Sequence, residues 1–149
     1  MDHVVFIDLQ ENDLEKLING TKRMILRGAT VRKLPYGRVQ PGDRLFFIPN
    51  DGTSWVHACA NVKMVWDSKP LSLEESRQII EDNQEQLQLS PIQLQRWSGK
   101  RFLVLIVLSR VTALIPFLID QSGFDNMDDW FPVGEIEQAK LENLPVLTS

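Results

Sequence analysis

A series of short apolar segments with the character of β-strands constrains the fold more than any other feature. These segments are His3–Asp8, Lys22–Arg27, Arg44–Pro49, Thr53–Trp66 and Arg101–Phe117. Within Thr53–Trp66 the side chains alternate with a period of two, which is typical of a strand with one packed face. Turn signals such as Pro41-Gly42-Asp43 separate the segments. The sequence therefore predicts a fold built around a sheet, with Arg101–Phe117 as one long central strand.

Two stretches have the pattern of helices instead. Leu14, Leu17 and Ile18 lie at helical spacing, and Gly20 supplies a left-handed stop. A Gln- and Glu-rich insertion at about 71–98 begins with a capping box and contains a second cap at Ser90 before Pro91. The insertion lies between strands, so we expect an α+β fold: a small mixed barrel with a helix after the first strand and a helical insertion before the last long strand.

The length of 149 residues fits one domain, which we expect to span residues 1–149. An acidic loop at about 120–134 carries Trp130, and a short helix is expected between Glu135 and Leu144. The single cysteine, Cys59, excludes an internal disulfide. The two histidines lie far apart, so we expect neither a metal site nor a cofactor.

The N-terminus has no signal peptide pattern, because it lacks a basic region before its short apolar run. The longest apolar run, Phe102–Ser109, has about eight residues, whereas a bilayer-spanning helix needs about 20. We therefore expect a cytoplasmic protein that does not bind a membrane; the oligomeric state is left open.

Charge is distributed unevenly along the chain. The net charge is −4, yet eight of the 16 basic residues lie between Lys16 and Arg44, where Asp43 is the one acidic residue. Such a run is either a charged strand edge that discourages pairing or a face that binds anions. Exposed strands usually mix the two signs of charge, so the shortage of acids favours anion binding.

Phosphate groups are bound by clustered lysine and arginine donors, and unpaired bases stack on exposed aromatic rings. Tyr36, between Pro35 and Gly37, is the preferred stacking candidate, and Trp130 is a second ring that would close over a pocket. The candidate ligand-binding residues are therefore Lys22, Arg23 and Arg27 for phosphate, Arg32, Lys33 and Arg38 for outer electrostatic support, and Tyr36 and Trp130 for bases.

Several of these motifs occur in an order that resembles the PUA-like superfamily, in particular its ASCH and EVE domains. The motifs are Gly20-Thr21-Lys22 after the first helix, Arg27 at the end of a strand, Gly42-Asp43 before Leu45-Phe46-Phe47, and a strand starting at Trp55. The resemblance covers about the first 66 residues and extends loosely to Phe102–Ile115. It implies a pseudobarrel whose cleft, beside the first helix, receives RNA, a modified base or a nucleotide-like ligand.

The resemblance also raises an alternative, because some ASCH proteins look like amidohydrolases that act on acylated cytidine. They use a lysine, a threonine three residues later and a glutamate. Lys22 matches the lysine, but Ile25 has no hydroxyl group, and the glutamate would have to be Glu74 or Glu75 at a helix start. We therefore expect a binding module for RNA or a nucleotide-like ligand, with no catalytic residue. A third alternative is an adaptor that binds a protein partner through the helical insertion or the acidic loop, unless that loop folds back onto the basic cleft.

Overall fold

The computed structural model describes residues 1–124 and 128–141. In these residues the strands are β1 (Asp2–Ile7), β2 (Met24–Ala29), β3 (Arg44–Pro49), β4 (Trp55–Asp67), β5 (Phe102–Leu108), β6 (Thr112–Leu118) and β7 (Trp130–Gly134). The helices are α1 (Asp13–Ile18), α2 (Leu73–Asp82), α3 (Gln84–Leu87), α4 (Pro91–Trp97) and α5 (Ile136–Ala139). No helix among the described residues is both long and apolar enough to cross a membrane.

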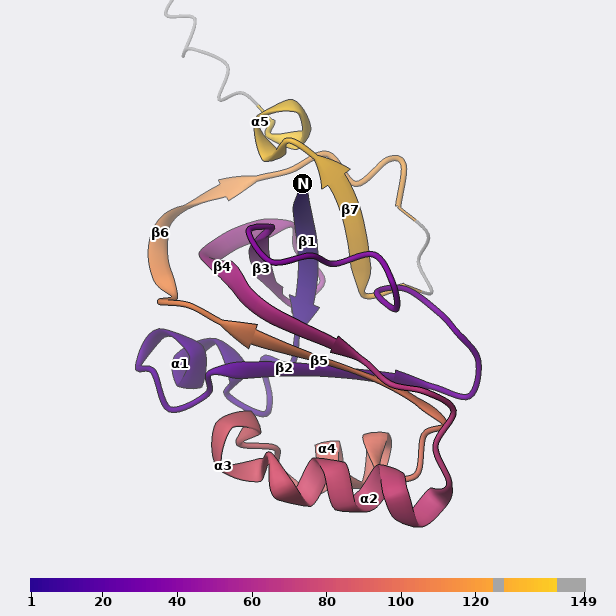
Figure 1. Ribbon diagram of the computed structural model, residues 1–149. Coiled ribbons are helices and arrows are strands. Elements are labelled where there is room, and N and C mark those ends of the chain that lie inside the picture. Colours follow the sequence, from indigo (N-terminus) through magenta and orange to yellow (C-terminus); the bar gives the residue numbers. More distant parts are fainter. Residues whose placement is uncertain (125–127, 142–149) are drawn as a thin grey trace, which may run out of the picture.

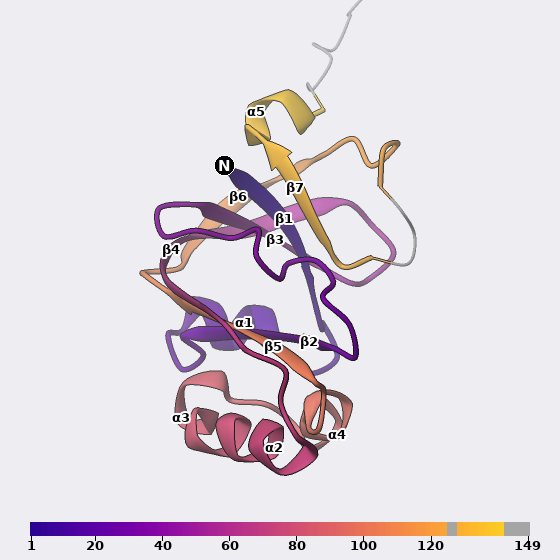
Figure 2. The same ribbon diagram turned by 45° about the vertical axis from the view of Figure 1, so that its right-hand side comes forward.

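The strands form one mixed sheet that curls into a half-barrel (Figures 1 and 2). The strand order is β2-β5-β4-β3-β1-β7, and β6 pairs with β4 outside this order. The pairing of β1 with β3 is parallel, while the other pairs are antiparallel. This arrangement confirms the predicted α+β fold with a small mixed pseudobarrel.

Strand β4 bends the sheet, because its two halves pair with different neighbours. Its first half pairs with β3 and β6, and its second half pairs with β5. Register shifts between Val56 and Ala58 and between Val62 and Met64 mark the irregular places along this strand. Such irregularities increase the local twist and let a long strand turn a corner.

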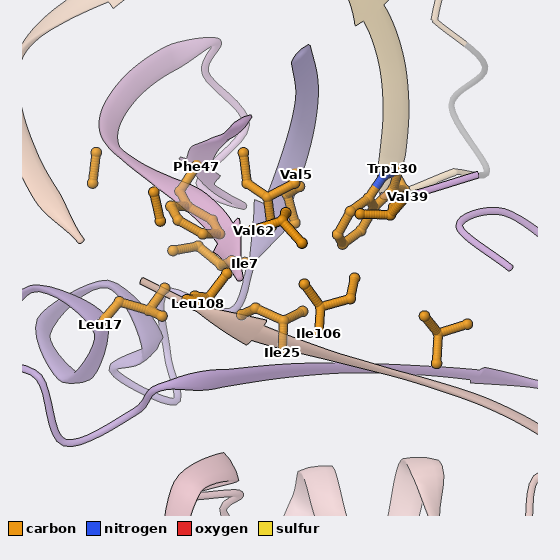
Figure 3. Close-up of a cluster of buried hydrophobic side chains, with 14 residues drawn as sticks. Val5, Ile7, Leu17, Ile25, Val39, Phe47, Val62, Ile106, Leu108 and Trp130 are labelled. Carbon is orange, nitrogen blue, oxygen red and sulfur yellow. The ribbon is translucent and has the colours of Figure 1, made fainter. Parts of the chain in front are cut away.

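The interior of the half-barrel holds the main hydrophobic core (Figure 3). Strand β2 shows how the alternation of side chains builds it. Ile25 points into this core, whereas Met24 and Leu26 point to the other face, where they meet the helices. Arg27 follows Ile25 on the inner face, as the alternation predicts. This inward position of β2 therefore places a guanidinium beside the barrel interior, where it lies near the Trp130 ring.

The helical insertion covers the outer face of β2 and β5 (Figure 1). Ser72 with Glu75 and Ser90 with Gln93 each form a complete capping box, so the predicted helix starts are confirmed. Leu87 and Leu89 pack under these helices against Met24, Leu26, Leu103 and Leu105. Ile92, another apolar residue of the insertion, stays exposed. The buried leucines of the insertion therefore pack on the protein's own sheet.

Two expectations about the second half of the chain are wrong. Arg101–Phe117 does not form one long strand, because the chain turns after Leu108 and continues as β6 along the other half of β4. Trp130 does not lie on an exposed loop; it begins β7, pairs with Val5 of β1 and is fully buried. Its ring points into the core in Figure 3. The predicted tail helix is the short α5, and residues 142–149 lie outside the described part.

Candidate functional site

The candidate site surrounds the side chain of Arg27. Its guanidinium lies beside two indole rings, with Cζ 5.9 Å from the centre of Trp97 and 5.7 Å from the centre of Trp130. Nη1 donates a hydrogen bond to the Leu26 carbonyl at 2.9 Å, and Nη2 donates to the Phe6 carbonyl at 2.7 Å. Arg27 therefore ties together β1, β2, β7 and α4, in addition to placing a positive charge at the barrel end.

The remaining guanidinium nitrogen of Arg27 faces a carboxylate. Nε lies 3.0 Å from Oδ2 of Asp129. The N–H direction is not aligned for a hydrogen bond to this or any other described atom. The contact is thus an ion pair held by charge rather than by a directed hydrogen bond.

A cleft of about 730 Å³ opens in front of Arg27. Its volume falls in the range of sites that bind small molecules. Its walls carry three basic, three acidic, four aromatic and several polar side chains. They include Arg27, Lys33 and Lys100, Asp8, Asp128 and Asp129, Phe6, Trp97, Phe124 and Phe131, and Thr30, Asn50 and Gln121.

One wall of this cleft is aromatic. The rings of Phe124 and Phe131 are stacked, with centres 4.1 Å apart and planes 7° apart. Phe6 meets Phe131 edge-on, with centres 6.0 Å apart. The pairs fix the ring orientations, because offset stacking and edge contacts are the favourable aromatic geometries. The cleft therefore offers a rigid apolar surface next to charged groups.

A smaller inner chamber of about 30 Å³ lies on the α1 and α4 side of Arg27. We define it by Lys22, Asp13, Gln93, Leu26 and Leu89; it shares Phe6, Asp8, Arg27, Trp97 and Asp129 with the cleft. Lys22 is buried, and its Nζ donates a hydrogen bond to the Leu87 carbonyl at 2.5 Å. Burial lowers the pKa of Lys22 to about 8, although the nearby Asp13 carboxylate opposes the shift.

A chain of polar contacts lines this chamber. Gln93 Nε2 donates to Asp13 Oδ2 at 3.0 Å and to Asp8 Oδ2 at 2.8 Å, and Arg96 Nη1 donates to the same Asp8 oxygen at 2.8 Å. Burial raises the pKa of Asp13 despite the charge of Lys22. Burial also opposes ionisation of Asp8, but its bonds from Gln93 and Arg96 prevail and lower its pKa. Asp13 Oδ1 has no hydrogen-bond partner among the described residues.

The structure separates the predicted ligand-binding residues into groups. Arg27 and Lys33 line the cleft, and Lys22 lies in the inner chamber rather than on an open surface. Arg23 is exposed at the start of β2, at the opposite end of that strand from the cleft. Arg38 is exposed on the loop that follows β2 and lies outside the cleft wall.

The two predicted stacking residues have structural contacts of their own. Tyr36 is half-buried; its hydroxyl donates to the Ser68 carbonyl and its ring meets Phe102 edge-on. Arg32 lies over both of these rings, at 5.6 Å from each centre. The expectation that Tyr36 is an exposed ring is therefore wrong. Trp130 is buried behind Arg27, and its indole N–H donates to His3 at 3.1 Å.

The acidic segment before β7 folds back onto the basic cleft, the arrangement raised above as an alternative. Lys33 Nζ lies 3.6 Å from Asp128 Oδ1, and Arg27 pairs with Asp129 as described. Asp125 lies outside the described residues. The cleft is therefore a site of mixed charge, and not the purely basic face that the sequence suggested.

Several residues of the site escaped sequence reasoning. Phe6, Phe131 and Asp8 are ordinary strand or strand-end residues, and nothing in the local pattern sets them apart. Lys100 follows the insertion, outside the basic run. The sequence does offer a signal for Trp97, a tryptophan near the end of the insertion at about 71–98 and a candidate for stacking a base, although core packing is the commoner role of a tryptophan.

Comparisons with known proteins identify the fold. No family model matches the chain, and no curated protein matches it. Among solved structures, ASCH from Zymomonas mobilis superimposes with a TM-score of 0.66 at 14% identity, covering 93% of this chain and 92% of that chain. Two single-substitution variants of that protein, tyrosine to phenylalanine and serine to alanine, give the same TM-score and identity, over 92% of this chain and 94% or 92% of theirs. The chain therefore has a PUA-like fold of the ASCH type, and the likeness extends well beyond the first 66 residues.

Proposed function

We propose that the Arg27 cleft binds RNA or a nucleotide-like ligand. The observation that carries this proposal is the combination of a stacked aromatic wall with lysines at the edge of one cleft of about 730 Å³. A nucleotide has the matching parts, namely a flat ring and an anionic phosphate. The ASCH-type fold is consistent with this role, because the superfamily it resembles receives such ligands in a cleft beside the first helix.

The aromatic wall would hold the base. Phe124 and Phe131 present ring surface, and Trp97 lies on the α4 side of the same cleft. Stacking of an unpaired base on an aromatic side chain contributes about 1–3 kcal/mol and tolerates different bases. Asn50, Thr30 and Gln121 provide amide and hydroxyl groups to hydrogen-bond the edge of the ring.

The lysines would hold phosphate. Lys33 is about half exposed, and Lys100 reaches the same cleft from the segment after α4. Arg32 and Arg38 are exposed on the neighbouring loop and add to the local positive potential. Phosphate contacts of this kind release counterions, so the affinity should fall with rising salt.

A double variant tests the proposal. Lys33→Ala with Lys100→Ala should weaken the binding of a short single-stranded RNA, measured by fluorescence anisotropy. The slope of log affinity against log salt should become shallower by about 1.4, since each phosphate contact on a single strand contributes about 0.7. Lys63→Ala with Lys69→Ala is the matched control, because it removes the same charge from exposed positions outside the cleft wall. Equal effects of the two double variants would contradict the proposal.

A second proposal, an amidohydrolase acting on acylated nucleosides, is favoured by the inner chamber. A buried lysine with its pKa lowered to about 8 next to a cleft is a typical general base or nucleophile. The rest of the expected set does not match. Ile25 is packed in the core, and Glu74 is exposed on α2, on a separate shallow groove. Asp13 is the carboxylate that lies beside Lys22 instead.

Mass spectrometry tests this second proposal. Incubation of the protein with N-acylated ribonucleosides should release the acyl group, and Lys22→Met should abolish the mass loss while the protein stays folded. If the wild-type protein leaves every acylated nucleoside intact, the amidohydrolase proposal is wrong.

A further inference from the structure

Two neighbouring carboxylates form ion pairs with two basic side chains of the cleft. Asp129 lies 3.0 Å from Arg27, and Asp128 lies 3.6 Å from Lys33. Both carboxylates line the same cleft as the cations they face. The charge that a ligand meets there thus depends on these pairs and not on the basic residues alone.

The position of Asp129 is set by the sheet. Its backbone carbonyl accepts a hydrogen bond from the Phe6 N–H at 2.9 Å, at the point where β7 joins β1. Its side chain is half exposed, while that of Arg27 is mostly buried. The backbone of Asp129 is therefore held by β1, at a position from which its carboxylate reaches Arg27.

Arg27 offers an approaching anion a restricted set of donors. Of its five N–H groups, one on each Nη nitrogen already donates to a carbonyl, that of Leu26 or that of Phe6. The Nε nitrogen faces Asp129. A phosphate group that approached this nitrogen would have to displace a carboxylate or lie beside it, and two like charges at such a distance repel each other.

We propose that Asp129 sets the charge preference of the cleft by neutralising Arg27. With Asp129 in place, the inner part of the cleft accepts an uncharged ring and disfavours an anionic group, which is kept at the edge near Lys33 and Lys100. This inference rests on the proposed ligand-binding function for the identity of the ring. Its electrostatic part concerns Arg27 and Asp129 alone, so simple anions can test it.

The experiment compares Asp129→Asn with the wild-type protein and with Glu81→Gln. Asn has nearly the same shape as Asp, so the variant removes the charge and keeps the backbone bond to Phe6. Glu81 is exposed on α2 away from the cleft, so its variant reproduces the change in net charge. The probes, measured by calorimetry at low salt, are inorganic pyrophosphate, the four ribonucleosides and their 5′-monophosphates.

We expect Asp129→Asn to bind pyrophosphate about two to five times more tightly than the wild-type protein, the range that a partly exposed ion pair supports. Glu81→Gln should change this affinity less than twofold. The preference for a monophosphate over its nucleoside should rise by a similar factor in Asp129→Asn. Asp129→Ser should also bind pyrophosphate more tightly than the wild-type protein. If one of the two Asp129 variants does not fold, the other still tests the inference.

Two failures can be told apart. If neither Asp129 variant binds pyrophosphate more tightly than Glu81→Gln does, or if no binding to either is detected, the inference about Asp129 is wrong. If the wild-type protein binds none of the nucleosides, monophosphates or a short RNA, the proposed function fails, and the pyrophosphate comparison still decides the role of Asp129.

Discussion

At the scale of single residues, Lys22 carries a charge whose burial destabilises the folded state. Its ammonium is buried beside the inner chamber, where Leu87 supplies one carbonyl and Asp13 an opposite charge. These partners do not fully replace water, and the pKa of Lys22 falls from 10.5 to about 8. A lowered lysine pKa means that folding favours the neutral amine, so the ammonium form destabilises the fold at neutral pH.

The substitution Lys22→Met should therefore raise the free energy of unfolding at pH 7, by on the order of 1 kcal/mol. The full shift corresponds to about 3 kcal/mol at about 1.36 kcal/mol per pKa unit, and the lost bond to Leu87 offsets part of it. The wild-type protein should gain stability as the pH rises from about 8 to about 10.5, because the unfolded chain then holds the extra proton. This gain should be absent from Lys22→Met.

Urea unfolding across this pH range measures both effects. Lys63→Met, at an exposed position of β4, is the matched control and should keep the alkaline gain. Other groups that titrate in the same range are common to all three proteins and cancel in the differences. A Lys22→Met variant with the wild-type slope would show that Lys22 is not held in a low-pKa environment.

Sequence reasoning located this region but not its geometry. Alternation along β2 correctly placed Ile25 and Arg27 on one face. The burial of Lys22 depends on Leu87, which lies 65 positions away and approaches because α3 packs over the start of β2. A local sequence pattern cannot predict a contact between residues so far apart. The basic run between Lys16 and Arg44 therefore suggested one surface, whereas its residues lie in several different environments.

At the scale of elements, local chemistry was predictable and pairing was not. The starts at Ser72 and Ser90 and the left-handed stop at Gly20 were predicted correctly, because each depends on a few neighbouring residues. The corner between β5 and β6 was not predicted, because an apolar run has the same sequence pattern whether it forms one straight strand or two strands that pair with different halves of β4. Ser109, whose N–H and hydroxyl both bond the Asn61 carbonyl, marks that corner.

The insertion shows why a partial resemblance gave a partial site. Its helices contribute Trp97 to the cleft and Gln93 to the inner chamber. The motifs of the resemblance ended before this segment, so these residues had no counterpart from which a role could be inferred. Likewise β7 was not predicted, because the segment before it is acidic and suggested a loop. Its pairing with β1 joins residues more than 120 positions apart.

At the scale of the whole molecule, His3 connects β1 to β7 and to the residue just before β3. The indole N–H of Trp130 on β7 donates to His3 Nδ1, so Nδ1 must accept and the ring proton must lie on Nε2. Nε2 then donates to Asp43, just before β3, at 2.9 Å. The N-terminal amine lies 3.6 Å from the same carboxylate. Protonation of His3 would cost the bond from Trp130, because a protonated Nδ1 cannot accept.

Because of this arrangement, the whole protein should become less stable in acid. Burial lowers the pKa of His3 below its usual 6.5, although Asp43 opposes the shift. The folded state therefore resists the proton that the unfolded chain accepts, and the free energy of unfolding should fall as the pH drops below about 6.5. The slope for one proton approaches about 1.4 kcal/mol per pH unit. The bonded carboxylates Asp2, Asp8 and Asp43 have lowered pKa values, so their losses come at lower pH.

Unfolding measured between pH 5 and pH 7 isolates the histidine. His3→Gln keeps an acceptor and a donor in the site, so it should fold with lower stability and lose the slope in this window. His57→Gln, on β4, removes the other histidine and should keep the wild-type slope. The fluorescence of Trp130 should report the same transition, since its N–H loses its acceptor. If His3→Gln unfolds with the pH dependence of the wild-type protein, then the strand junction at His3 does not limit stability in acid.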